Sequence, residues 1–99
     1  MLMPIQLLVK LKLKEKRMYK VRIEKAVVKS LEKINEPYYS KIKMSILKFV
    51  SNPHLQGYKQ LKADRFLIRI ADYRIIYNIF EDILSINVID LGHRKDIYM

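Results

Sequence analysis

The sequence has no cysteine, no tryptophan and only two glycines among its 99 residues. Without cysteine the chain can form neither disulfides nor thiolate metal sites, which is compatible with a reducing cytoplasm. Its two histidines, His54 and His93, lie far apart in the sequence and form no metal-binding pattern. We therefore expect no metal and no other cofactor. With so few glycines, there is also no glycine-rich phosphate loop.

Long hydrophobic runs are also missing. The apolar stretch 1–9 is far shorter than the roughly 20 residues of a membrane span, and no basic segment precedes it as in a signal peptide. We expect a soluble, cytoplasmic protein with no membrane partner. A chain of 99 residues has room for one hydrophobic core, so we expect one compact domain.

Acidic residues are scarce. Ten Asp and Glu stand against twenty Lys and Arg, which gives a formal net charge of +10 and a pI near 9.9. A protein this basic attracts polyanions, and RNA or DNA phosphates are the commonest of these. An anionic membrane surface and an acidic protein partner are the alternatives.

Residues 1–17 differ from the rest of the chain. Residues 8–17 alternate apolar and basic side chains and end in a block of charge, a pattern that fits an edge strand, a disordered arm or sequence upstream of a true start at Met18. We expect an accessory basic extension or misassigned start over 1–17, and the domain over 18–99. The basic character does not depend on the extension, which carries five of the twenty Lys and Arg and one Glu.

The hydrophobic pattern predicts the order β-α-α-β-β-β. Alternation from Tyr19 to Glu24 predicts a strand, followed by a helix to about Asn35 and a second helix from about Pro37 to a stop at 51–53. After a polar loop over 54–64, three β-branched and aromatic runs predict strands at 66–70, 73–80 and 83–91. This order indicates an α+β fold, in which two helices pack on one face of a small, mainly antiparallel sheet.

Short connections between the last three strands fix a register. A two-residue connection at 71–72 pairs Arg69 with Arg74, and one at 81–82 pairs Ile79 with Leu84 and Ile75 with Val88. One face of the sheet then collects a complete apolar surface for the helices: Phe66, Ile68, Ile70, Tyr73, Ile75, Tyr77, Ile79, Leu84, Ile86 and Val88.

The opposite face is predicted to hold two opposed guanidinium groups, those of Arg69 and Arg74. Like charges across a ladder disfavour folding by a few tenths of a kcal/mol or more. The pair makes sense if an anion sits between the two side chains, because arginine forks fit phosphate geometry. In the alternative interpretation, both side chains extend into water or pair with Asp72 and Asp90.

Two segments of the sequence carry a family resemblance. Residues 66–77 read FLIRIADYRIIY and residues 91–98 read LGHRKDIY. The hairpin followed by a Gly-His-Arg…Tyr motif resembles the RelE/ParE toxin superfamily over roughly residues 18–99. The RelE-like branch implies a small sheet with two helices and a toxin that cuts messenger RNA in the ribosomal A site. It also implies a cognate antitoxin, encoded by a neighbouring gene, that inhibits the toxin in a hetero-oligomer.

The resemblance carries over residue by residue, with two departures. Arg69 matches a basic strand residue, Arg74 the hairpin arginine, Arg94 the arginine after the glycine, and Tyr98 the terminal tyrosine. Leu67 stands where a lysine or arginine is usual, and Ala71 where glycine is common. ParE-like relatives inhibit DNA gyrase without catalysis, and their terminal motif is usually less similar to Gly-His-Arg…Tyr. The resemblance therefore favours a RelE-like nuclease, with a ParE-like inhibitor or an inactive antitoxin-binding relative as the alternatives.

Metal-free RNA cleavage needs cations for the phosphorane charge, a base and an acid. Arginine stays protonated near neutral pH, so Arg69, Arg74 and Arg94 suit the first need but not proton transfer. The candidates for proton transfer are His93, Tyr98 and Lys95, although His93 also reads as a solvated or capping residue and Tyr98 as a base-stacking residue. We expect further RNA contacts from basic residues near this site, which are Lys62, Arg65 and Lys95.

Overall fold

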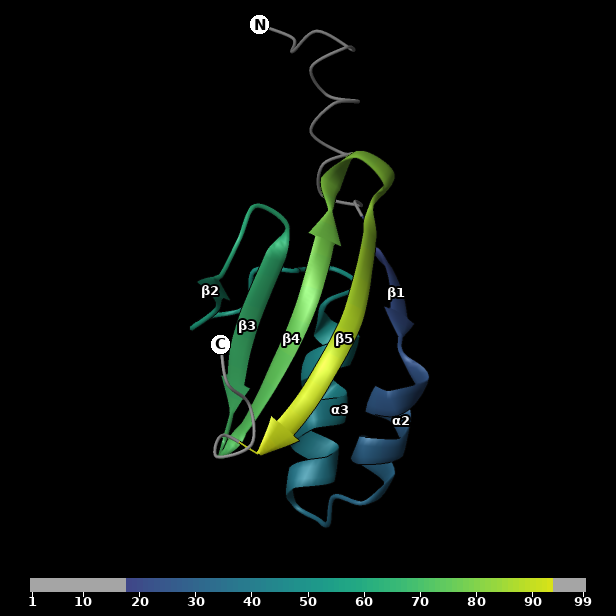
Figure 1. The fold of residues 1–99 in the computed structure, drawn as a ribbon, viewed down its shortest axis with the longest axis vertical. Coiled ribbons are helices and arrows are strands. Elements are labelled where there is room, and N and C mark those ends of the chain that lie inside the picture. Colours follow the sequence, from purple (N-terminus) through teal and green to yellow (C-terminus); the bar gives the residue numbers. More distant parts are fainter. Residues whose placement is uncertain (1–17, 94–99) are drawn as a thin grey trace, which may run out of the picture.

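The computed structural model describes residues 18–93, so the predictions for 1–17 and 94–99 lie outside the described residues. The described part begins with a strand and two helices and continues with strands joined by short connections (Figure 1). The elements are β1 (Lys20–Ile23), α2 (Lys25–Glu32), α3 (Tyr38–Lys48), β2 (Lys59–Gln60), β3 (Arg65–Ile70), β4 (Tyr73–Phe80), a 3-10 turn (Glu81–Ile83) and β5 (Ser85–His93).

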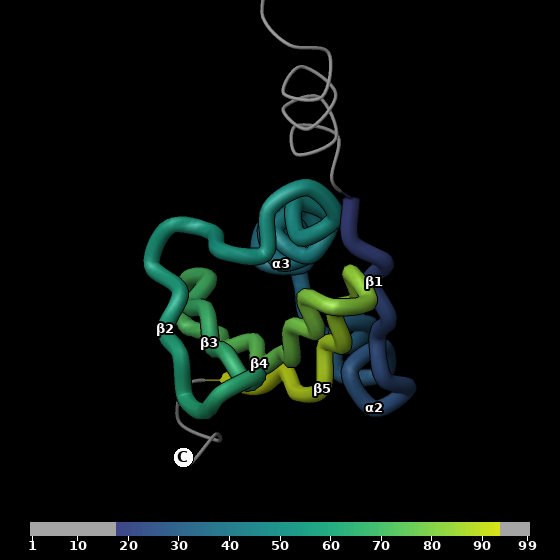
Figure 2. Tube along the Cα trace, turned by 90° about the horizontal axis from the view of Figure 1, so that it is seen from above, coloured from purple at the N-terminus to yellow at the C-terminus, as the bar shows by residue number. Residues whose placement is uncertain are grey.

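The strands form one five-stranded sheet in the order β1-β5-β4-β3-β2. β1 pairs with β5 in parallel, and the other neighbours are antiparallel, so the sheet is mixed. β1 therefore lies at an edge of the sheet, a position that the sequence pattern does not predict. Seen from above, the sheet curves around α3, while α2 lies next to β1 and β5 (Figure 2). This arrangement confirms the predicted α+β fold.

The helices bury their apolar residues against one face of the sheet. Val27 of α2 and Ile42, Ile46 and Phe49 of the α3 region are each at most 4 % exposed and share one cluster with the sheet. α3 begins directly after Pro37, which closes the preceding turn. The carboxylate of Glu36 accepts hydrogen bonds from the backbone N–H and hydroxyl of Ser40, and these bonds lower the pKa of Glu36. The start of α3 is thereby fixed by local contacts.

The first hairpin has the predicted register. Ile70 pairs with Tyr73, Arg69 with Arg74 and Phe66 with Tyr77, so the connection is two residues long. All ten side chains predicted for the apolar face are either buried in the main cluster or packed against it. Leu91 joins them, with 5 % of its surface exposed. The core was therefore predicted correctly from alternation alone.

The second hairpin differs from the prediction by two positions. Ile79 pairs with Ile86 rather than Leu84, and Val88 pairs with Tyr77 rather than Ile75. The cause is the connection, because a 3-10 turn and Leu84 at φ 48° make it four residues long instead of two. A shift of two leaves every side chain on its predicted face. A bulge then places Ile89 between the pairs Tyr77–Val88 and Ile76–Asp90.

The two-residue connection of the first hairpin contains a strained residue. Ala71 has a φ of 55°, a region that L-residues enter at a cost of about 1–2 kcal/mol and that glycine enters freely. The preferred turn sequences of short hairpins place glycine or asparagine at such positions. The strained backbone of Ala71 thus lowers the stability of the fold while it keeps the two-residue connection that sets the β3–β4 register.

Ala71→Gly should raise the free energy of unfolding by about 0.5–1 kcal/mol, because relief of the strain exceeds the extra entropy that glycine gains in the unfolded chain. Urea denaturation of both proteins measures the difference. Ala63→Gly, in an exposed turn where no positive φ occurs, is the matched control and should show no gain. A destabilised Ala71→Gly protein would contradict this account of the turn.

Tyr77 ties the loop after α3 to the sheet. Its ring is fully buried and packs on Phe49 with the ring centroids 4.4 Å apart, and its hydroxyl donates to the carbonyl of Pro53 at 3.0 Å. Burial, with a smaller contribution from Tyr58, raises the pKa of Tyr77 to about 12. The folded protein therefore stabilises the neutral, hydrogen-bonded phenol of Tyr77 over the ionised form.

Tyr77→Phe should lower the free energy of unfolding by about 1 kcal/mol at neutral pH, because the Pro53 carbonyl loses its donor. A raised pKa adds stability that is complete below the unfolded-state pKa and is lost as pH rises toward the folded-state value. The wild type should therefore lose stability between about pH 10 and pH 12 faster than the variant. Urea denaturation of both proteins across this range tests it; a gap that stays constant would argue against a buried phenol that resists ionisation.

Candidate nucleic-acid interface

The face of the sheet opposite α3 carries a row of two guanidinium groups. Arg69 on β3 and Arg74 on β4 are direct partners in the ladder, and Gly92 on β5 continues the row. Partners in a ladder project to the same side of a sheet, so both arginines lie on this open face. Arg69 is exposed and Arg74 is half-buried. Because Gly92 has no side chain, the row stays open beside Arg74.

A second row crosses the open face four residues away along β3 and β4. It runs from Arg65 through Asn78 and Asn87 to Arg22, each paired with the next across a strand boundary. Arg65 Nε and Asn87 Oδ1 are buried and make no hydrogen bond within residues 18–93. Buried polar atoms are nearly always satisfied in folded proteins, so this row offers polar groups that water or a polar ligand can meet.

A small apolar cluster separates the two rows. Leu67 on β3 and Ile76 on β4 are 4 % and 7 % exposed and pack together with Leu61 and Ile89. The extra residue of the β5 bulge is therefore one of the four side chains. Leu67, the departure from the superfamily pattern, is a packing residue here and supplies no base. Sequence reasoning missed this cluster, although apolar residues at open-face positions of β3 and β4 were a visible signal.

Two aspartates lie near the guanidinium row in the part of the chain described. Asp90 pairs with Ile76 on the open face, and its Oδ1 accepts the backbone N–H of Leu91 at 2.8 Å. Asp72 is exposed in the turn beyond Arg69. Neither aspartate stands between the two arginines in the ladder. Two guanidinium groups side by side can bind an anion bidentately, and their positive field extends above the sheet.

His93 lies on the other side of the sheet. It pairs with Tyr73, a residue of the helix-covered face, and the two rings meet edge to face at 5.5 Å. The structure therefore brings Arg69 and Arg74 together but separates His93 from them by the thickness of the sheet. Arg65 opens β3 on the open face, and Lys62 is exposed in the turn between β2 and β3. Arg94, Lys95 and Tyr98 fall outside the described residues.

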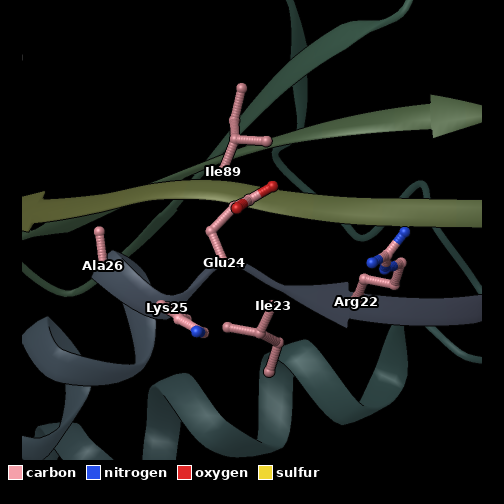
Figure 3. Close-up of a pocket in the computed structure, with 6 residues that line it drawn as sticks. All are labelled: Arg22, Ile23, Glu24, Lys25, Ala26 and Ile89. Carbon is pink, nitrogen blue, oxygen red and sulfur yellow. The ribbon is translucent and has the colours of Figure 1, made fainter.

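A cleft of about 610 Å³ lies at the junction of β1 and α2, next to the Arg22 end of the second row (Figure 3). Figure 3 shows the carboxylate of Glu24 directed toward β5, with the guanidinium of Arg22 and the amine of Lys25 set apart from it. Its charges are mixed and do not converge, so the open face is the better candidate site. The lining residues are Arg22, Ile23, Glu24, Lys25, Ala26 and Ile89.

Neither a metal cluster nor a membrane-spanning helix occurs among residues 18–93. No group of three or more His, Asp or Glu side chains could hold a metal ion there. No helix in that part of the chain has the length and apolar character needed to cross a membrane.

Solved structures of RelE toxins have the same fold. A chain of the archaeal RelE–RelB complex from Pyrococcus horikoshii matches with a TM-score of 0.70 and 23 % identity, over 81 % of this chain and 99 % of that one. The RelB–RelE antitoxin–toxin complex from Methanococcus jannaschii gives 0.63 and 23 %, over 79 % and 99 %. The isolated E. coli RelE toxin gives 0.65 and 18 %, over 76 % and 83 %.

Of the two sequence comparisons, only the one with protein-family models gives a match. No curated protein sequence matches the chain. The family model described as "ParE toxin of type II toxin-antitoxin system, parDE" matches residues 21–98, which is most of the chain and includes every helix and strand of the described residues except Lys20 of β1. This chain belongs to the ParE toxin family of type II toxin–antitoxin systems, within the RelE/ParE superfamily.

Proposed function

We propose that this toxin is a metal-independent endoribonuclease that cleaves messenger RNA in the ribosomal A site and so arrests translation. The observation that carries the proposal is the direct pairing of Arg69 with Arg74 on the open face. Two guanidinium groups held side by side concentrate positive charge on the open face, and their forks can bind an anion between them. A scissile RNA phosphate is an anion of the right geometry.

In the proposed reaction, the 2′-oxygen of one nucleotide attacks the phosphorus and loses its proton. The bond to the 5′-oxygen of the next nucleotide breaks, and this oxygen gains a proton, which leaves a 2′,3′-cyclic phosphate and a 5′-hydroxyl. Arg69, Arg74 and Arg94 hold the extra negative charge of the phosphorane, usually the largest contribution to such catalysis. Tyr98 positions the base or transfers a proton, and Lys62, Arg65 and Lys95 bind neighbouring phosphates.

The positions of His93 and Leu67 limit which groups can move protons. His93 packs on Tyr73 on the helix-covered face, which favours a role in holding the end of β5 over contact with a phosphate between the arginines. Leu67 is buried and apolar. We therefore assign proton transfer to Tyr98, Lys95 or groups of the ribosome, and charge stabilisation to the arginines.

We further propose a cognate antitoxin encoded by a neighbouring gene, with which the toxin forms a cytoplasmic hetero-oligomer. The structural neighbours from P. horikoshii and M. jannaschii were solved as complexes of RelE with RelB. A partner rich in acidic side chains would match the net charge of +10 and cover the cationic face.

A second candidate function is inhibition of DNA gyrase without catalysis. The match to the ParE family model over residues 21–98 favours it, and so does the apolar residue at position 67. Two assays distinguish these functions. Primer extension on messenger RNA after induction yields new 5′ ends only for a nuclease, whereas supercoiling of purified plasmid DNA by gyrase is blocked only by a gyrase inhibitor.

Arg74→Glu should abolish the growth arrest that follows expression without antitoxin, because the clamp loses one cation and gains an anion. Growth curves after induction measure it, and far-UV circular dichroism shows whether the variant is folded. Lys43→Glu changes the net charge equally on an exposed position of α3 and should remain toxic. A fully toxic Arg74→Glu protein would remove the basis for the nuclease assignment.

A further inference from the structure

An exposed pair of aromatic rings lies at the β2 edge of the sheet, on the helix-covered side with Phe66 and around this edge from the guanidinium row. His54 and Tyr58 have ring centroids 4.8 Å apart, and both rings border Phe66, at 5.7 Å and 5.9 Å. Tyr58 keeps 44 % of its surface exposed, and His54 is exposed too. Phe66 itself is only 7 % exposed. The two rings therefore stand on a buried aromatic base and present their outer surfaces to solvent.

The loop that carries the pair is held in place by short-range contacts. The backbone N–H of His54 donates to Asn52 Oδ1 at 3.0 Å, and that of Tyr58 donates to the carbonyl of Leu55, also at 3.0 Å. The bond from Tyr77 to Pro53 anchors the loop to the core, and Gly57 at φ 89° makes the turn that returns the chain to β2. The rings are thus presented in a fixed arrangement, which reduces the entropy lost when a ligand binds.

Basic side chains follow the pair in the same hairpin. Lys59 pairs with Leu67 and so projects to the open face, Lys62 lies in the turn, and Arg65 opens β3 in the second polar row. Figure 1 shows β2 and this turn along the outer edge of β3. One carboxylate, that of Asp64, lies in the turn among these three cations. The edge between the aromatic pair and the guanidinium row is therefore predominantly positive.

We propose that His54 and Tyr58 form a stacking platform for an unpaired base of single-stranded RNA. The strand would bend around the β2 edge, with its phosphates on Lys59, Lys62 and Arg65. Aromatic rings beside a cationic groove are the usual means of binding single strands, since every base has a face to stack and every linkage has a phosphate. This inference rests on the proposed function, because it extends the RNA site from the arginines to a flanking nucleotide.

Packing on Phe66 is the competing explanation for the pair, through apolar contact and ring–ring attraction. The proposal instead depends on stacking of the aromatic ring on a base, and this distinction can be tested with side chains of similar size. Tyr58→Phe keeps the ring and removes the hydroxyl, whereas Tyr58→Leu keeps an apolar cover on Phe66 and removes the ring.

The probe is a fluorescein-labelled 2′-O-methyl oligoadenylate, whose blocked 2′-oxygen prevents cleavage, titrated with the full-length protein by fluorescence anisotropy. Tyr58→Leu should weaken binding roughly ten-fold, as expected for loss of one base–aromatic stack, and Tyr58→Phe should bind like the wild type. An oligonucleotide of equal length with abasic sugars keeps the phosphates. Tyr58→Leu and the wild type should bind this abasic strand equally, because no base is left to stack.

Tyr39→Leu is the matched control, since Tyr39 is a partly exposed tyrosine beside a lysine, with Lys43 Nζ 6.0 Å from its ring, but lies on α3. It should bind the oligoadenylate like the wild type. Urea denaturation of each variant shows whether a loss of binding follows from unfolding; a ten-fold loss in a protein of unchanged stability supports the platform.

Three results would overturn the platform. The first is unchanged oligoadenylate binding by Tyr58→Leu. The second is an equal loss on the abasic strand. The third is intact RNA binding with weakened binding of the antitoxin, which would assign the pair to the protein partner. In each of these cases new 5′ ends on messenger RNA after induction of the wild type, absent with Arg74→Glu, would still support the nuclease assignment, so the two proposals fail separately.

Discussion

The two-residue connection between β3 and β4 is the constraint on which the rest of the structure depends. It fixes which side of the sheet each residue of β3 and β4 faces, because side chains alternate at every step along a strand. With this connection, Phe66, Ile68 and Ile70 meet Tyr77, Ile75 and Tyr73 on the helix-covered side. Arg69 and Arg74 are then opposed on the other side. One residue more or less would turn one strand over relative to the other, and so place its arginine in the core and its core-facing isoleucines in water.

Sequence reasoning succeeded where a single periodicity decides the outcome. Alternation from Phe66 to Phe80 fixed the hairpin register and the sheet's side of the core, and the hydrophobic pattern predicted both helices. It failed where backbone geometry decides. The four-residue connection needs Leu84 at positive φ, which cannot be predicted from a leucine in the sequence. The bulge at Ile89 also cannot be predicted, because it lies in a run of apolar residues without a turn signal. The connection changes pairing but not facing, and the bulge changes facing only after Val88, so the core prediction survived the error.

The candidate site was predictable to the same degree. The opposition of Arg69 and Arg74 follows from the register of the first hairpin, and that register follows from the alternation of residue types alone. The position of His93 could not be predicted, because the bulge changes which residues of β5 share a face with Val88. The packing role of Leu67 needed Leu61 and Ile89 as neighbours, and these come from a turn and a bulge. Contacts between residues so distant in sequence produce no periodic pattern from which they could be predicted.

The parallel pairing of β1 with β5 has a consequence for synthesis of the protein. β5 lies between β1 and β4, yet it is the last strand of the described residues to be made, and β1 is the first. Contacts so distant in sequence form late in folding, since the intervening chain must be ordered before they compensate its entropy. A nascent chain can close the β3–β4 hairpin, but it leaves β1 without its neighbour until residues 85–88 emerge. A ribosome must therefore synthesise the chain as far as residue 88 before β1 can pair with β5.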